Sequence, residues 1–340
     1  MANHHLFSLG NFALECGIVL RDAKLAYQTY GELNAKKNNA ILLCSWYTGD
    51  HRGYEFLIKP GLCFDPTKYF VIAANMFANG LSSSPSNTPK PFDGAHFPSI
   101  TIRDNIRAQH QLVTQQFGIE KLLMVAGFSM GAQQSFQWGV SYPDMVERIA
   151  PWCGAARTTP HTHVFIEGFT SALKADAAWN GGHYHEQPDR GLRALARVYA
   201  GWGFSQTWYR QHLYRELGHP SVEDFLVAFW ENFMLQCDAN NLLSQAKTWQ
   251  THNVGTTPGF NGDHQKALAS IKAKAVVMPG QTDLYFPVED NVAEVECMSN
   301  AVLKPIPSVW GHFAGFGMNA ADTEFIDRAV KECLVGEKNP

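Results

Sequence analysis

Long apolar runs are absent from this sequence, since no segment reaches the roughly eighteen apolar residues of a membrane span. Residues 1–5, Met-Ala-Asn-His-His, also lack the charged start and apolar run of a secretory signal peptide. These absences argue against membrane insertion and secretion. We therefore expect a cytoplasmic protein that does not bind a membrane.

Charge of one sign is not in excess either. Lys and Arg total 27 and Asp and Glu total 31, a net charge of −4, and no basic stripe could neutralise a phosphate backbone. We therefore expect no binding of nucleic acid. The seven cysteines are scattered and show no CxxC spacing, which indicates reduced, mostly buried thiols.

The chain does contain the material for one large core. Its 340 residues are 45% hydrophobic and 17% charged, as in globular proteins. Short, nearly continuous apolar runs separated by helical patterns are typical of a parallel sheet covered on both faces, so we predict an α/β fold. The predicted strands are residues 40–45, 69–75, 122–126, 149–153, 274–279 and 303–307.

Helical patterns complete this organisation. Thr101 and Asp104 have capping-box spacing at the start of a helix that Gly118 ends, and residues 322–334 form a last helix. Between residues 155 and 263 the strand-like runs vanish and Trp, Tyr and His become frequent. We predict an inserted helical cap there, with residues 1–154 and 264–340 forming the core.

The strongest chemical signal is Gly127-Phe128-Ser129-Met130-Gly131, which follows an apolar strand and precedes a predicted helix. This GxSxG pattern could be an ordinary glycine-rich turn. The strand before it and the helix after it favour the nucleophile elbow of the α/β-hydrolase fold, a tight turn that presents the serine. Ser129 is the predicted nucleophile.

A serine nucleophile needs a histidine base and an acid that orients the base, and both should follow it in the chain. Asp283 and His312 each come just after a predicted strand, where open parallel sheets place their active sites. Glu289 and Asp290 are rival acids, and His312 could instead be a core histidine. We predict the triad Ser129, Asp283 and His312.

A developing oxyanion needs backbone donors. The N–H of Met130, at a helix N-terminus, should supply one, and an N–H from the loop after the first core strand should supply the other. Tyr47 in that loop is the candidate, although the loop could also be a plain apolar wall.

A metal or bound cofactor is not expected. The pairs His161/His163 and His183/His185 have no carboxylate or cysteine companions at ligand spacing, so loop or pocket-lining histidines are favoured. The phosphate-binding pattern GxxxxGK[ST] and the dinucleotide pattern GxGxxG do not occur.

Taken together, the sequence resembles the homoserine O-acetyltransferase family over nearly its whole length. The resemblance is carried by residues 30–34 (YGELN), 64–72 (FDPTKYFVI), 101–104 (TIRD), the elbow with Gln133, and 238–243 (DANNLL). It implies transfer of an acyl group from acyl-coenzyme A, as the donor substrate, to Ser129 and then to an alcohol. It also implies a capped pocket and a homodimer, with Asp283 and His312 completing the triad.

The differences from the family concern the substrate. Where this chain has Phe128 and Ala132, the family usually has a small residue and a glycine. Where this chain has Phe313, the family has an aspartate that helps to receive the substrate amine. With Phe313 in its place we expect an acceptor less polar than homoserine. The candidate substrate contacts are Trp46, Phe128 and Phe313, and the arginines left open for a substrate carboxylate are Arg103, Arg157, Arg210 and Arg215.

Three functions remain in competition. The resemblance favours an O-acyltransferase with a different acceptor from homoserine. An esterase of the same fold would use water to attack the same acyl-enzyme. A catalytically inactive interaction protein is the third, and the complete Ser, Asp, His order argues against it.

Overall fold

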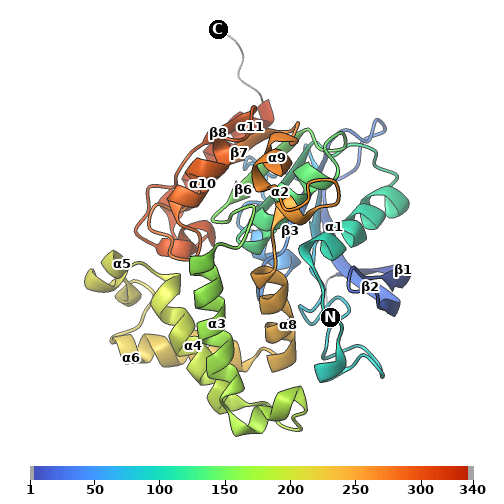
Figure 1. Ribbon diagram of the computed structural model, residues 1–340. Coiled ribbons are helices and arrows are strands. Elements are labelled where there is room, and N and C mark those ends of the chain that lie inside the picture. Colours follow the sequence, from blue (N-terminus) through green and yellow to red (C-terminus); the bar gives the residue numbers. More distant parts are fainter. Residues whose placement is uncertain (1–3, 336–340) are drawn as a thin grey trace.

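The computed structural model describes residues 4–335, so residues 1–3 of the N-terminal segment and residues 336–340 lie outside it. Its centre is one eight-stranded sheet (Figure 1). The strands are β1 (His5–Ala13), β2 (Val19–Tyr30), β3 (Ala40–Cys44), β4 (Phe70–Ala74), β5 (Met124–Phe128), β6 (Arg148–Trp152), β7 (Lys274–Val277) and β8 (Ala301–Leu303).

The sheet is mostly parallel, as predicted. Its order is β1-β2-β4-β3-β5-β6-β7-β8; the pairs from β4 to β8 are parallel, and only β1 and β2 run antiparallel to their neighbours. Every residue of β3, β4 and β5 is buried. Both faces of the sheet are therefore covered, which explains the continuous apolar runs in the sequence.

Two differences from the predicted strands have physical causes. The strand predicted at residues 303–307 lies earlier, at β8, because Pro305 has no N–H to donate to a ladder; only Ile306 returns, in an isolated bridge to Gly280. The β1–β2 hairpin was missed. Most of β1 is exposed or half-buried and register shifts interrupt its pairing, so no regular apolar alternation marks it.

Eleven α-helices accompany the sheet in residues 4–335. They are α1 (Ile102–Gln111), α2 (Met130–Ser141), α3 (Pro160–Lys174), α4 (Asp189–Gly203), α5 (Gln206–Arg210), α6 (Val222–Phe225), α7 (Asn232–Leu235), α8 (Ala239–Gln250), α9 (His264–Ala269), α10 (Val288–Val295) and α11 (Ala320–Val335). Two π-helical turns, Leu112–Gln116 and Leu226–Glu231, extend α1 and join α6 to α7.

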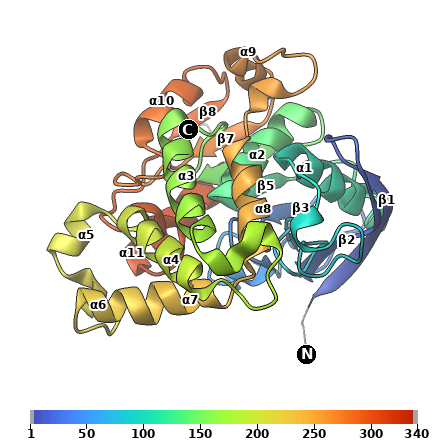
Figure 2. The same cartoon turned by 60° about the horizontal axis from the view of Figure 1, so that its bottom comes forward.

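The segment between β6 and β7 contains helices and no strand. In Figure 1 the helices α3, α4, α5, α6 and α8 form a body below and to the left of the sheet, and Figure 2 shows the same grouping from another side. The long helices α3 and α8 lie side by side in both views. This segment between β6 and β7, called the cap segment below, is the one for which the sequence predicts a cap. Its boundaries at residues 155 and 263 stay a prediction.

The remaining general expectations concern thiols and membranes. All seven cysteines are free; Cys44, Cys63 and Cys153 are buried, and Cys16 is exposed. Among residues 4–335, no helix combines the length and the apolar character that crossing a membrane requires.

The start of α1 provides a test of local stability. Thr101 Oγ1 accepts the N–H of Asp104 and the Asp104 carboxylate accepts the N–H of Thr101, both at 3.0 Å, which is the predicted capping box. Thr101→Ala should lower the free energy of unfolding by about 1 kcal/mol in urea titrations. Thr101→Ser, which keeps the oxygen, should change it by only a few tenths of a kcal/mol; equal losses would contradict the cap.

Candidate active site

Ser129 lies at the sharp turn between β5 and α2. Its φ is 58° and its ψ is −121°, a strained conformation for a residue with a side chain. Only 3% of the residue is exposed, and its side chain lines a cavity. The motif predicted from sequence thus adopts the geometry of a nucleophile elbow.

The two glycines of the motif are required by space. A Cβ on Gly127 would lie 2.4 Å from the carbonyl oxygen of Gly131, and a Cβ on Gly131 would lie 2.2 Å from the carbonyl oxygen of Cys44. Both distances are far below van der Waals contact. The glycines therefore let the first turn of α2 pass close to the ends of β5 and β3.

Ser129, His312 and Asp283 form one hydrogen-bonded chain. The Ser129 Oγ lies 2.9 Å from His312 Nε2, and His312 Nδ1 lies 2.7 Å from Asp283 Oδ2. Because a carboxylate accepts, Nδ1 carries the proton and Nε2 is free to accept the serine hydroxyl. The structure brings together three residues that are far apart in sequence.

The loop after β7 fixes the Asp283 carboxylate. Its other oxygen, Oδ1, accepts the N–H groups of Tyr285 and Phe286 at 2.8 and 3.2 Å. Burial, together with the Asp283 charge beside it, raises the pKa of Cys153 well above its usual range, so that neighbour is a neutral thiol.

The rival acids lie elsewhere. Glu289 is exposed at the start of α10. Asp290 lines a separate polar cavity together with Arg157, His264 and Glu294. Neither carboxylate contacts His312, so only Asp283 of the three orients the imidazole in this structure.

The two predicted oxyanion donors come from adjacent strand ends. Cys44 at the end of β3 pairs with Gly127 near the end of β5, and the chain continues from these strands to Tyr47 and Met130. In residues 4–335 neither the N–H of Tyr47 nor that of Met130 has a protein acceptor. Met130 is also the first residue of α2, where the helix dipole favours negative charge.

Ser129 and His312 line a cavity of about 310 Å³. Its walls are mainly aromatic and aliphatic, and no Asp, Glu, Lys or Arg takes part in them. The lining residues are Trp46, Tyr47, Thr48, Phe128, Ser129, Tyr199, Ala228, Phe229, Trp230, Asn232, Phe233, Met234, Gln236, His312, Phe313 and Phe316.

The three predicted substrate contacts all lie in this lining. The ring of Phe128 is 4.6 Å from that of His312 and 5.2 Å from that of Trp46, between ring centres. Phe313 stacks on Phe204 from the cap segment, with ring centres 4.4 Å apart and planes within 8°. Tyr199 and Trp230 from the cap segment also line the cavity, so core and cap segments share its wall.

Tyr47 contributes its ring as well as its backbone. The phenol is buried, its ring stacks on Tyr199 at 5.9 Å, and its hydroxyl has no protein partner among the described residues. Burial, and to a lesser extent Tyr199 and Cys237, raises the pKa of this phenol well above its usual range, so the hydroxyl keeps its proton.

Part of the lining had no signal in the sequence. The π-helical turn Leu226–Glu231 and helix α7 contribute six lining residues, including Phe229, Trp230 and Met234. An apolar stripe in a helical segment has the same pattern whether it faces a core or a cavity. Only the tertiary structure separates the two.

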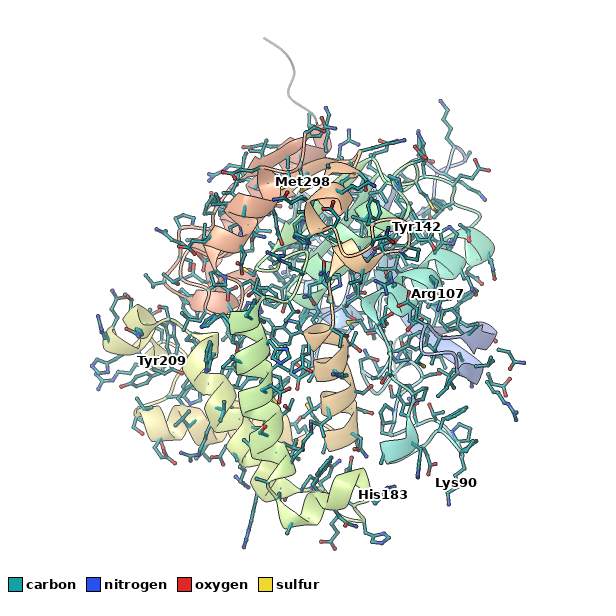
Figure 3. The ribbon with its side chains drawn as sticks, in the orientation of Figure 1. Lys90, Arg107, Tyr142, His183, Tyr209 and Met298 are labelled. Atoms are coloured by element: carbon teal, nitrogen blue, oxygen red, sulfur yellow. The ribbon has the colours of Figure 1, made fainter. Side chains whose placement is uncertain are left out.

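The other candidates lie outside the cavity. His161 packs on Trp202, and His183, at the lower end of the cap segment in Figure 3, packs on His96. Residues 4–335 contain no group of three or more His, Cys, Asp or Glu side chains arranged to hold a metal ion.

None of the four arginines left open contacts the cavity. Arg103 pairs with Glu15 at 2.6 Å, and Arg157 lines the separate polar cavity. Arg210 contacts Gln206, and Arg215 ends a short helical turn in the cap segment. The cavity therefore has no arginine for a substrate carboxylate.

Comparison with known proteins agrees with this geometry. Residues 39–316 match the family described as the alpha/beta hydrolase fold, and the chain belongs to that family. It is 40% identical over 329 residues to a probable esterase of Corynebacterium glutamicum, and the alignment covers 96% of this chain and 94% of the relative. It is 38% identical over 332 residues to an ethyl acetate hydrolase of Pseudomonas veronii, covering 97% and 95%.

The resemblance found in the sequence is also confirmed. A homoserine O-acetyltransferase of Chlorobium chlorochromatii is 30% identical over 319 residues, covering 89% of this chain and 88% of the relative. The solved structure of an acetylester hydrolase from Corynebacterium glutamicum superposes with a TM-score of 0.95 at 38% identity, covering 98% and 96%. The chain is therefore an enzyme of the acyltransferase or ester hydrolase type, and a divergent relative of the homoserine O-acetyltransferases.

The hydrogen bond between His312 and Asp283 gives a direct prediction. Asp283→Asn should lower kcat for 4-nitrophenyl acetate by about 10⁴-fold, because an amide holds the imidazole in the wrong tautomer. Glu289→Gln and Asp290→Asn, which change carboxylates that do not contact His312, should keep nearly full activity. A fully active Asp283→Asn enzyme beside an inactive Asp290→Asn enzyme would move the acid to α10.

Proposed function

We propose that this protein is a carboxylic ester hydrolase that acts on small, uncharged esters, acetyl esters foremost. In this proposal Ser129 is the nucleophile, His312 the general base and Asp283 the acid that orients it. The N–H groups of Tyr47 and Met130 form the oxyanion hole. Trp46, Phe128 and Phe313 contact the substrate.

The first half-reaction forms an acyl-enzyme. Ser129 Oγ attacks the ester carbonyl carbon while His312 Nε2, 2.9 Å away, takes the hydroxyl proton. The two backbone N–H groups stabilise the oxyanion that develops. The bond to the alcohol oxygen then breaks, and His312 returns the proton to the leaving alcohol.

The second half-reaction frees the serine. Water attacks the acyl carbon as His312 takes one of its protons, and the oxyanion forms again in the same place. The bond to Ser129 Oγ then breaks and His312 returns the proton to the serine. The products are the carboxylic acid and the alcohol.

The observation that carries this proposal is the hydrogen-bonded Ser129–His312–Asp283 chain at an apolar cavity without Asp, Glu, Lys or Arg. Burying an ammonium or a carboxylate there would cost several kcal/mol, because no opposite charge receives it. An uncharged ester loses much less on leaving water. The names of the esterase and ethyl acetate hydrolase relatives support the same substrate class.

Acyl transfer to an alcohol is the second candidate. The sequence alone favoured it through the resemblance to the homoserine O-acetyltransferases, and it uses the same acyl-enzyme. The more similar relatives are named as hydrolases, so we place water before an alcohol as the attacking group. The expected homodimer and cytoplasmic location stay predictions; the proposed site needs residues of one chain only.

One experiment separates the two candidates. Ethyl acetate and acetyl-coenzyme A are each supplied as donor, with and without a panel of alcohols, and acetate, free thiol and acetylated alcohol are measured together. Hydrolysis predicts acetate from ethyl acetate at the same rate without alcohol. Product formation that depends on one alcohol would instead establish transfer and identify the acceptor.

Ser129→Ala should lower kcat for 4-nitrophenyl acetate by at least about 10⁴-fold, because the nucleophile is lost. Mass spectrometry should find a fluorophosphonate adduct on Ser129 in the parent and none in this variant. Ser135→Ala is the matched control, since it removes a buried hydroxyl from the same helix. Equal labelling of parent and Ser129→Ala would show that the nucleophile lies elsewhere.

Homoserine should be a poor acceptor for the parent, with a kcat/KM well below that of uncharged alcohols of similar size. Phe313 offers an ammonium group at most a cation–π attraction of about 0.5–2 kcal/mol, less than a carboxylate would supply. Phe313→Asp should raise the use of homoserine relative to those alcohols, while Phe313→Leu should not. Homoserine as the best acceptor of the parent would contradict the prediction.

A further inference from the structure

Two buried side chains, Tyr54 and Gln134, each contact two chain segments: residues 44–47 at the end of β3, and residues 128–130 around Ser129. Resting on the proposed function, we propose that they are positioning residues that set the spacing of the two oxyanion donors, the N–H groups of Tyr47 and Met130. Neither side chain lines the cavity, so both act through the backbone that they hold.

Tyr54 joins the end of β3 to the end of β5. Its hydroxyl donates to the carbonyl of Cys44 at 2.5 Å and accepts the N–H of Phe128 at 2.9 Å. Cys44 comes three residues before Tyr47, and Phe128 two residues before Met130. One oxygen atom therefore connects the two segments that carry the donors.

The environment of Tyr54 keeps this bridge intact. The residue is fully buried, and burial raises the pKa of its phenol well above the usual range, so the hydroxyl retains the proton that it donates. Gly131 makes room for it, since a Cβ there would lie 2.8 Å from the Tyr54 oxygen. Gly131 therefore packs directly against the hydrogen bond between Tyr54 and Cys44.

Gln134 makes a second bridge one step further along both segments. Its Nε2 donates to the carbonyl of Ser45 at 2.7 Å and to that of Met130 at 3.1 Å. Ser45 comes two residues before Tyr47 in the same loop. The amide thus connects the loop of one donor directly to the residue that carries the other.

A further residue fixes the orientation of the Gln134 amide. Gln134 Oε1 accepts from Gln109 Nε2 at 2.6 Å, and Gln109 Oε1 accepts the indole N–H of Trp138 at 2.8 Å. An indole nitrogen only donates, so the orientation of Gln109 is determined and that of Gln134 follows. All three side chains are fully buried.

The energetic reason for such bridges is the precision that an oxyanion hole requires. Donors stabilise the oxyanion when they lie about 2.7–3.1 Å from its position, and a displacement of about 1 Å can cost about 100-fold in rate. A merely structural role would lower stability alone. A positioning role lowers kcat and weakens the binding of transition-state analogues by a similar factor, while KM stays nearly constant.

The test uses Tyr54→Phe and Gln134→Met, which remove the polar groups and keep much of the volume. Tyr209→Phe is the matched control: it removes a hydroxyl that donates to the carbonyl of Ala200 at 2.7 Å, at the outer edge of the cap segment (Figure 3). Measured are kcat and KM for 4-nitrophenyl acetate, the affinity for a trifluoromethyl ketone that forms a tetrahedral adduct, and the melting temperature.

We expect kcat to fall about 10- to 100-fold in Tyr54→Phe and in Gln134→Met, with KM within about twofold. The affinity for the trifluoromethyl ketone should fall in parallel, and the pH profile should keep its shape, because His312 and Asp283 are untouched. Tyr209→Phe should keep the parent kcat. Each enzyme is assayed well below its own melting temperature, and Gln134→Met is an independent test if Tyr54→Phe does not fold.

A parent-like kcat in either folded variant, or a loss confined to KM or to the melting temperature, would overturn this inference. Failure of the proposed function has a different signature, which is turnover by Ser129→Ala. An inactive Ser129→Ala enzyme beside a fully active Tyr54→Phe enzyme would refute the bridges and leave the ester hydrolase in place.

Discussion

The close contact between Gly131 and the carbonyl of Cys44 is the constraint on which the rest of the site depends. A side chain at Gly131 would lie 2.2 Å from that oxygen, so α2 reaches the end of β3 only because this residue is glycine. The same approach places the N–H of Met130 beside the loop of Tyr47. Ser129, with its strained backbone, lies two residues before this contact.

The sequence predicted the parts of the molecule that local rules determine. The GxSxG motif, the capping box of α1 and the apolar runs of the parallel strands each depend on neighbouring residues or on burial of a whole strand. Asp283 and His312 were found because chain order and strand ends restrict where they can lie. The structure brings both to Ser129.

The parts that were missed depend on long-range packing. Strand β1 of the missed hairpin has an exposed, irregular pattern, and the last strand, β8, ends at Leu303, before Pro305. Tyr54 and Gln134 resemble any aromatic or amide residue in a helical segment until their partners are known. The cavity wall from Leu226–Glu231 and α7 has the same apolar pattern as a core helix.

In the proposed ester hydrolysis, the absence of fixed charge from the cavity wall would also affect the release of the acid product. An ester arrives neutral, whereas the acid it yields loses a proton in neutral water and becomes an anion. Apart from the two proposed oxyanion donors, the wall offers that anion no group to replace the water molecules that it would lose by staying bound. The carboxylate product should therefore leave the cavity readily, and acetate that accumulates in solution should inhibit the enzyme only weakly.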